Sequence, residues 1–123
     1  MMTNARKKLG AWGEKVAIMH LQAHGYKILE QNWHCQIGEI DIIAQKNDVV
    51  SFVEVKTRRG RSAGSPEESI TPRKAQKLMQ TALTWLGEQE DDDADWQIDL
   101  IAVELDPKGK LLRCEHFQNF VVG

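Results

Sequence analysis

Apolar residues recur along the chain at two spacings, which predict where its helices and strands lie. Between residues 4 and 24 the spacing is three or four, the period of one helix face. Asn4 fits the cap at the start of this helix, and Gly25 fits the position just beyond its end. The apolar face of this helix would consist of Leu9, Trp12, Val16, Met19 and Ala23.

Shorter apolar runs predict five strands, at residues 26–33, 37–44, 49–56, 97–105 and 111–117. Lys46, Asn47 and Asp48 predict a tight turn that joins the second and third strands as an antiparallel pair. Residues 58–69 are rich in Gly, Ser and Arg and predict a mobile loop. The acidic stretch 88–95 predicts a solvated loop.

A second helix is predicted between the third and fourth strands. Thr71 fits its N-cap, Pro72 its first position and Gly87 its end. The side chains expected to face inward are Ala75, Leu78, Met79, Ala82, Trp85 and Leu86. The order of helix, three strands, helix and two strands predicts an α/β fold with a mixed sheet, built as one domain over residues 1–123.

Composition narrows the class of protein only in part. The chain has 123 residues, of which 41% are hydrophobic, and a net charge of −2 does not indicate a nucleic-acid binder. Six acidic residues lie within 88–95, so the rest of the chain carries a net charge of +4, enough for a basic face. Two cysteines without a pairing pattern, no signal-peptide core and no apolar stretch of about 18 residues predict a reduced, cytoplasmic protein without a membrane span.

Charged residues interrupt the second and third strands, where their neighbours are apolar. Side chains alternate between the two faces of a strand, so Glu39 and Asp41 share one face, as do Glu54 and Lys56. The opposite face would carry their apolar neighbours Ile40, Ile42, Val53 and Val55. If the two strands pair through the short turn, three carboxylates and one ammonium group meet at one end of the sheet.

Such a cluster suggests binding of a divalent cation. Carboxylates brought together repel, and burial makes each charge more costly. Mg²⁺ prefers oxygen ligands and would relieve this repulsion at Asp41 and Glu54, with a backbone carbonyl completing the set. Lys56 would offset negative charge on a reacting phosphate, so these residues suit metal-dependent phosphodiester hydrolysis. The alternative is an exposed sheet face on which Glu54 and Lys56 take part in cross-strand pairs.

Two segments carry a resemblance to a known superfamily. Residues 38–41 (GEID) and 52–58 (FVEVKTR) resemble the core strands of the PD-(D/E)XK nucleases. Within that superfamily the chain closely resembles the YraN family of small bacterial proteins, with further likeness at residues 10–14, 32–33 and 98–103. The resemblance implies a restriction-endonuclease-like fold, with a central mixed sheet between helices, as in archaeal Holliday-junction resolvases.

The resemblance also implies roles for individual residues. Asp41 and Glu54 match the metal ligands of the motif, the carbonyl of Val55 its backbone ligand, and Lys56 its catalytic lysine. Glu14 matches an extra acid that some members use near the metal, which would be Mg²⁺ or Mn²⁺. We expect Glu39 to support these ligands or to face the substrate, and Asp99 to pair with a buried base or a backbone group.

The expected partner is DNA, including branched or structured DNA. Phosphate contacts would come from Arg58, Arg59, Arg61, Arg73, Lys74 and Lys77, which otherwise form a solubilising surface. Action on two strands, as in the resolvases, would favour a homodimer. The competing hypotheses are a nuclease fold that binds nucleic acid or a protein partner without cleavage, and a purely structural protein.

Overall fold

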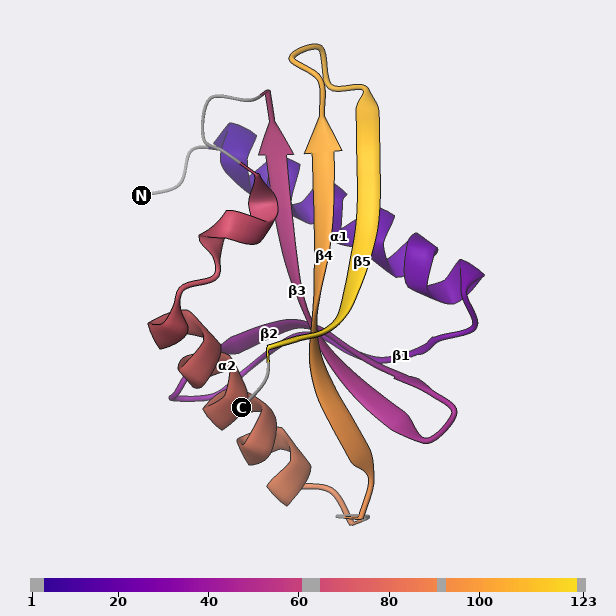
Figure 1. The fold of residues 1–123 in the computed structure, drawn as a ribbon, viewed down its shortest axis with the longest axis vertical. Coiled ribbons are helices and arrows are strands. Elements are labelled where there is room, and N and C mark those ends of the chain that lie inside the picture. Colours follow the sequence, from indigo (N-terminus) through magenta and orange to yellow (C-terminus); the bar gives the residue numbers. More distant parts are fainter. Residues whose placement is uncertain (1–3, 61–64, 91–92, 122–123) are drawn as a thin grey trace.

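The chain forms one five-stranded sheet with a helix on each side (Figure 1). The structure, a computed structural model, describes residues 4–60, 65–90 and 93–121. Its elements are α1 (Asn4–Ala23), β1 (Lys27–His34), β2 (Glu39–Lys46), β3 (Val49–Arg59), the short 3-10 helix η1 (Pro66–Ser69), α2 (Pro72–Gly87), β4 (Asp95–Leu105) and β5 (Leu111–Val121). The strand order is β1-β2-β3-β4-β5, in which β3 and β4 run parallel and all other neighbours antiparallel. This mixed sheet confirms the predicted α/β, restriction-endonuclease-like fold.

The hairpin of β2 and β3 lies where the sequence predicts it. Asn47 and Asp48 have φ of 51° and 66°, the left-handed values that the tightest hairpin turns require. β3 extends beyond its predicted end, because its parallel pairing with β4 continues to Arg59 opposite Leu105. The predicted loop is correspondingly shorter: residues 61–64 lie outside the described residues, and Pro66–Ser69 form η1.

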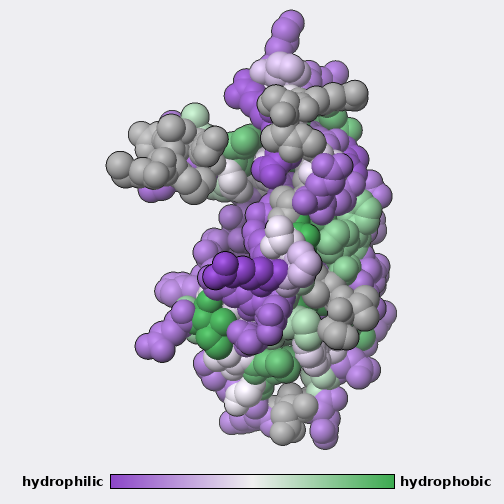
Figure 2. All heavy atoms as spheres, turned by 60° about the vertical axis from the view of Figure 1, so that its left-hand side comes forward, coloured by the Kyte–Doolittle hydropathy of each residue, from purple (hydrophilic) through white to green (hydrophobic). Residues whose placement is uncertain are grey.

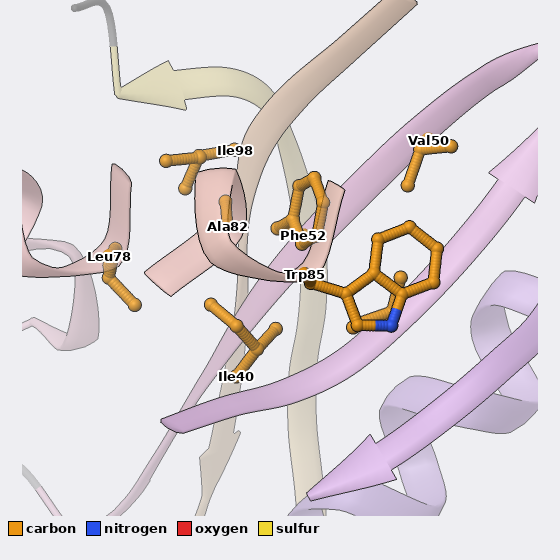
Figure 3. Packing of buried hydrophobic residues seen from close by; sticks show 8 residues of the cluster. Ile40, Val50, Phe52, Leu78, Ala82, Trp85 and Ile98 are labelled. Carbon is orange, nitrogen blue, oxygen red and sulfur yellow. The ribbon is translucent and has the colours of Figure 1, made fainter. Parts of the chain in front are cut away.

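Two hydrophobic clusters, one on each side of the sheet, hold the helices in place. On the α2 side, Leu78, Ala82 and Trp85 of the helix are directed at the sheet, where Phe52 lies beneath them (Figure 3). The rings of Phe52 and Trp85 meet edge to face with centroids 5.7 Å apart, a favourable aromatic geometry. The α1-side cluster consists of Ala17, Leu21, Ile42, Ala44, Val53, Ile101 and Val103.

Ile40 and Ile42 do not share a face, which corrects the expectation from strict alternation. Ile40 belongs to the α2-side cluster and Ile42 to the α1-side cluster. Asn32 of β1 lies between the residues that pair with these two, and it has a left-handed φ of 52°. The pairing of β2 with β3 also ends at Ile42. The backbone is therefore irregular around Asp41, where the charged residues gather.

α1 buries a different face from the one that its apolar periodicity predicts. Trp12 and Met19 are 37% and 69% exposed, so the prediction is wrong at these two residues, whereas Val16 packs against the α1-side cluster as predicted. The buried residues of the helix are instead Gly13, Ala17 and Leu21. A Cβ atom at Gly13 would overlap Oγ1 of Thr57 on β3, so only a glycine lets the helix come this close. The next residue, Glu14, is thereby brought close to β3.

The ends of both helices agree with the sequence. Gly25, with φ of 88°, follows α1 and donates its N–H to the carbonyl of Gln22 at 3.1 Å. Oγ1 of Thr71 accepts the N–H of Lys74 at 3.2 Å and caps α2, which begins at Pro72. α1 begins at Asn4, whose side chain lies outside the described part of the structure.

Asp99 on β4 is fully buried and is held by three donors. Its carboxylate contacts Nε2 of His116 at 2.7 Å, the N–H of Asn119 at 2.8 Å and the side-chain amide of Gln97 at 3.0 Å. The expectation that Asp99 pairs with a buried base or a backbone group is therefore confirmed. These bonds anchor β5 to β4 where their register shifts.

The surface on the α2 side is mostly hydrophilic. Figure 2 shows hydrophobic side chains on this face as separate patches among polar ones. Within the described ranges, no helix is both long enough and apolar enough to cross a membrane.

Candidate active site

The candidate site lies where β2 and β3 stop pairing. Their backbone ladder ends at the pair Ile42 and Val53. One step further, Oδ2 of Asp41 accepts the backbone N–H of Val55 at 2.8 Å, so a side chain replaces a bond of the ladder. β3 remains in the sheet because it pairs with β4 on its other side. The carboxylate of Asp41 is therefore held between the two strands.

Glu54 brings a second carboxylate and two lysines to the same place. Its side chain and that of Lys56 lie on one face of β3, as alternation predicts. Oε1 of Glu54 lies 3.5 Å from Nζ of Lys56 and 3.3 Å from Nζ of Lys74. Lys74 belongs to the first turn of α2, which the Thr71 cap fixes in position. The ion pair of Glu54 with Lys74 thus connects α2 to β3.

One pocket contains both carboxylates. Asp41 and Glu54 line it together with Glu39, so the acidic residues of the two strands converge as expected. The complete lining is Gly38, Glu39, Asp41, Glu54, Lys74, Lys77, Leu78 and Thr81.

Three of these lining residues are not expected in the site from the sequence. Leu78 and Thr81 follow Lys74 at steps of four and three, and this spacing identifies one stripe of α2 as the wall of the pocket. Gly38 precedes β2, and a Cβ atom there would lie 2.9 Å from Oγ1 of Thr81. A glycine at this position therefore lets the start of β2 approach α2 closely.

Burial and mutual repulsion change the acidity of the site. The pKa of Asp41 rises from 3.8 to about 7, because burial and then the charge of Glu54 disfavour its ionised form more than the N–H of Val55 favours it. Burial, and then the neighbouring Lys74, lower the pKa of Lys56 although Glu54 opposes the change. Asp41 therefore holds its proton more tightly than a free aspartic acid does, even with two ammonium groups nearby.

Glu14 of α1 is close enough to interact with the acids of the sheet. Burial, followed by the charges of Glu39 and Glu54, raises its pKa, while a hydrogen bond with the side chain of Asn32 acts in the opposite direction. Glu14 in turn contributes to the raised pKa of Asp41. The first helix thus brings a fourth carboxyl group near the acids of the sheet.

The residues of the site fit a hard divalent cation. A cation at Asp41 and Glu54 would favour the ionised carboxylates and so reverse the effect that raises the pKa of Asp41. Carboxylate and carbonyl oxygens are the ligands that Mg²⁺ and Mn²⁺ prefer. Among the described residues, no three His, Cys, Asp or Glu side chains form a ready-made metal cage. Two carboxylates, a backbone oxygen and water would be a ligand set typical of Mg²⁺.

Three of the basic residues expected to contact phosphates lie close to the catalytic candidates. Lys74 and Lys77 line the pocket. Arg58 follows Lys56 by two residues on β3, which places it on the same face of the strand. Among the buried side-chain nitrogen and oxygen atoms that the structure describes, Nε of Arg58 is the one without a hydrogen-bond partner.

Arg59 and Arg73 are not among the residues that line the pocket. Arg59 donates Nε–H to the carbonyl of Pro107 in the turn between β4 and β5, at 3.1 Å. Arg73 is exposed on α2, and Arg61 lies outside the described residues.

One family model and several known proteins match much of the chain. The model of Uncharacterised protein family UPF0102 matches residues 13–103. A UPF0102 protein of Pelotomaculum thermopropionicum is 41% identical over 118 residues, which cover 96% of this chain and 98% of the relative. A UPF0102 protein of Geobacter metallireducens is 40% identical over 118 residues, covering 96% and 95%, and one of Syntrophomonas wolfei is 50% identical over 80 residues, covering 65% and 70%. The chain therefore belongs to the UPF0102 family, which is the YraN family that its GEID and EVK segments resemble.

Proposed function

We propose that the protein is a metal-dependent nuclease that hydrolyses phosphodiester bonds of DNA, including branched or structured DNA. The observation that carries the proposal is the meeting of Asp41 and Glu54, from neighbouring strands, in one pocket beside Lys56. The resemblance of residues 38–41 and 52–58 to the core strands of the PD-(D/E)XK nucleases supports it.

Asp41, Glu54 and the carbonyl of Val55 would hold Mg²⁺ or Mn²⁺, with Glu14 as an additional acid. The bound ion would polarise the phosphate and make the attacking water more acidic. The N–H of Val55 engages one oxygen of Asp41 and orients the carboxylate, which leaves its second oxygen for the cation. Because this bond comes from the strand that carries Glu54, it also sets the two carboxylates relative to each other.

Lys56 would stabilise the negative charge that develops on the phosphate during the reaction. Its ammonium group is held 3.5 Å from Oε1 of Glu54, one of the two carboxylates that line the pocket. A half-buried ammonium interacts more strongly with a phosphate than one in bulk water would, because water screens it less. Arg58 and Lys77 would bind phosphates next to the scissile one, contacts that fix position without reading sequence. A homodimer would allow cleavage of two strands.

A module that binds nucleic acid or a protein partner without cleaving is the second candidate. It is favoured by the two lysines that already neutralise Glu54, since a structural ion-pair network needs no metal. This candidate predicts salt-sensitive DNA binding with no cleavage products.

A cleavage assay distinguishes the two. Linear, single-stranded, flapped and four-way DNA would be incubated with the wild type, Asp41→Asn and Lys56→Ala, in Mg²⁺, Mn²⁺ or EDTA. We expect products only with the wild type and a divalent metal, while circular dichroism shows that both variants are folded. Equal cleavage by both variants would rule out the assigned roles, and binding without products on every substrate would favour the binding module.

A further inference from the structure

Two ammonium groups meet at a single oxygen of Glu54. Nζ of Lys74 lies 3.3 Å and Nζ of Lys56 3.5 Å from Oε1. Together they carry the charge of one divalent cation, and they contact a carboxylate that the cation would need. A cation on Glu54 would lie within a few ångströms of both, and like charges at such separations repel strongly in a partly buried site. At least one lysine must therefore withdraw when the cation binds.

We propose that Lys74 holds the place of the divalent cation on Glu54 and is released toward a DNA phosphate when the cation binds. The inference rests on the proposed function and adds to it a means by which the metal and the DNA assist each other's binding. Lys74 belongs to α2, which lies outside the sequence motif on β2 and β3.

Lys74 is the lysine better able to move. Lys56 lies in the part of β3 that is paired with β4, opposite Ala102, and its side chain is 21% exposed. Lys74 belongs to another element, α2, and its side chain is 35% exposed. The four-carbon stem of a lysine lets its ammonium group swing over several ångströms without a change in the backbone. Release of Lys74 therefore leaves both the strand and the helix in place.

A phosphate is the group that a released Lys74 would meet. Lys77 lines the same pocket, and Arg73 is exposed on the same turn of α2. An anion bound across this end of the helix would also be favoured by the positive end of the helix dipole. DNA phosphate would thus replace Glu54 as the partner of Lys74 at the moment when the cation takes Glu54. By reciprocity, bound cation strengthens DNA binding and bound DNA strengthens cation binding by the same factor.

Calorimetric titration of Mn²⁺ into the DNA-free protein tests whether Lys74 competes with the cation for Glu54. Lys74→Met removes the competing ammonium group, so its dissociation constant for Mn²⁺ should be at least about fivefold lower than that of the wild type. Lys77→Met is the matched control: it removes the same charge from the same pocket without removing a contact to Glu54, and should change the constant much less. Lys74→Arg keeps the charge and should resemble the wild type.

Fluorescence anisotropy with four-way DNA, measured in EDTA and in Ca²⁺, tests whether the released Lys74 binds a DNA phosphate. Gels would confirm that the DNA stays intact. Ca²⁺ should increase the affinity of the wild type for DNA by a larger factor than that of Lys74→Met. The substitution should not unfold the protein, because the Thr71 cap uses the backbone N–H of Lys74, and Lys74→Gln provides a second neutral variant.

The outcomes separate this inference from the proposed function. If the wild type bound no Mn²⁺, both the proposed metal-dependent nuclease and the role of Lys74 would be overturned. A wild type that binds Mn²⁺, with neutral Lys74 variants that bind it equally or more weakly, would overturn only the role of Lys74. An equal gain in DNA affinity for the wild type and Lys74→Met would overturn the release of Lys74 toward phosphate.

Discussion

Asp41 should make the metal-free protein less stable as the pH rises, and Asp41→Asn should remove this effect. The pKa of the carboxyl group is about 7 in the folded protein, against about 3.9 in an unfolded chain. Between these values the folded state binds the proton more tightly than the unfolded state does. The free energy of unfolding therefore falls as the pH rises from about 4 to about 7, and the loss is complete above that range.

The size of the effect follows from the two pKa values. Their difference corresponds to roughly 4 kcal/mol, at about 1.4 kcal/mol for each pKa unit. An asparagine has nearly the same shape, and its side-chain oxygen can still accept the N–H of Val55. We expect Asp41→Asn to be more stable than the wild type by roughly 2–4 kcal/mol at pH 8, and by less than about 1 kcal/mol at pH 4.5.

Urea unfolding in EDTA, followed by circular dichroism between pH 4.5 and 8, measures this difference. Asp48→Asn is a suitable control, because Asp48 is exposed in the β2–β3 turn and asparagine tolerates its left-handed φ of 66°. The control should show no gain that grows with pH. If Asp41→Asn were equally stable or less stable than the wild type at pH 8, burial and the charge of Glu54 would not disfavour the ionised form of Asp41 as described.

Two further substitutions test how the fold supports the site, each by urea unfolding. Gly13→Ala should lower the free energy of unfolding by about 1–3 kcal/mol, because the new Cβ atom overlaps Thr57. The control is Gly10→Ala in the same helix, where the Cβ atom meets open space; it should leave stability unchanged or raise it by up to about 1 kcal/mol. Equal effects of the two substitutions would contradict the close packing of α1 on β3. Asp99→Ala should cost about 3 kcal/mol or more, since it leaves His116 and a backbone N–H without their buried acceptor; a loss below about 1 kcal/mol would show that water replaces these bonds.

Local signals in the sequence predict most of the elements, because the interactions involved join residues that are close in the chain. The turn at Asn47 and Asp48 and the cap of Thr71 are of this kind, and both are found. The buried face of α1 could not be predicted in the same way. What decides it is the approach of Gly13 to Thr57, which are far apart in the sequence. Close approach favours a small residue, so counting large apolar residues wrongly places Trp12 and Met19 on the buried face.

The spacing of residues predicts the geometry of the candidate site where the site depends on one hairpin. Alternation and the short turn are enough to bring Asp41, Glu54 and Lys56 together. The ion pair between Glu54 and Lys74 depends on how α2 packs on the sheet, which the spacing of its apolar residues does not specify. The parallel pairing of β3 with β4 likewise depends on the whole chain, and it is this pairing that extends β3 past the site to Arg59.

Diffraction from crystals soaked in Mn²⁺ would show whether Asp41 and Glu54 together hold a divalent cation. We expect one anomalous difference peak in contact with oxygen atoms of both carboxylates in the wild type, and its loss in crystals of Asp41→Asn. A wild-type crystal with no peak there, or with Mn²⁺ bound only elsewhere, would show that the two carboxylates do not form a metal site.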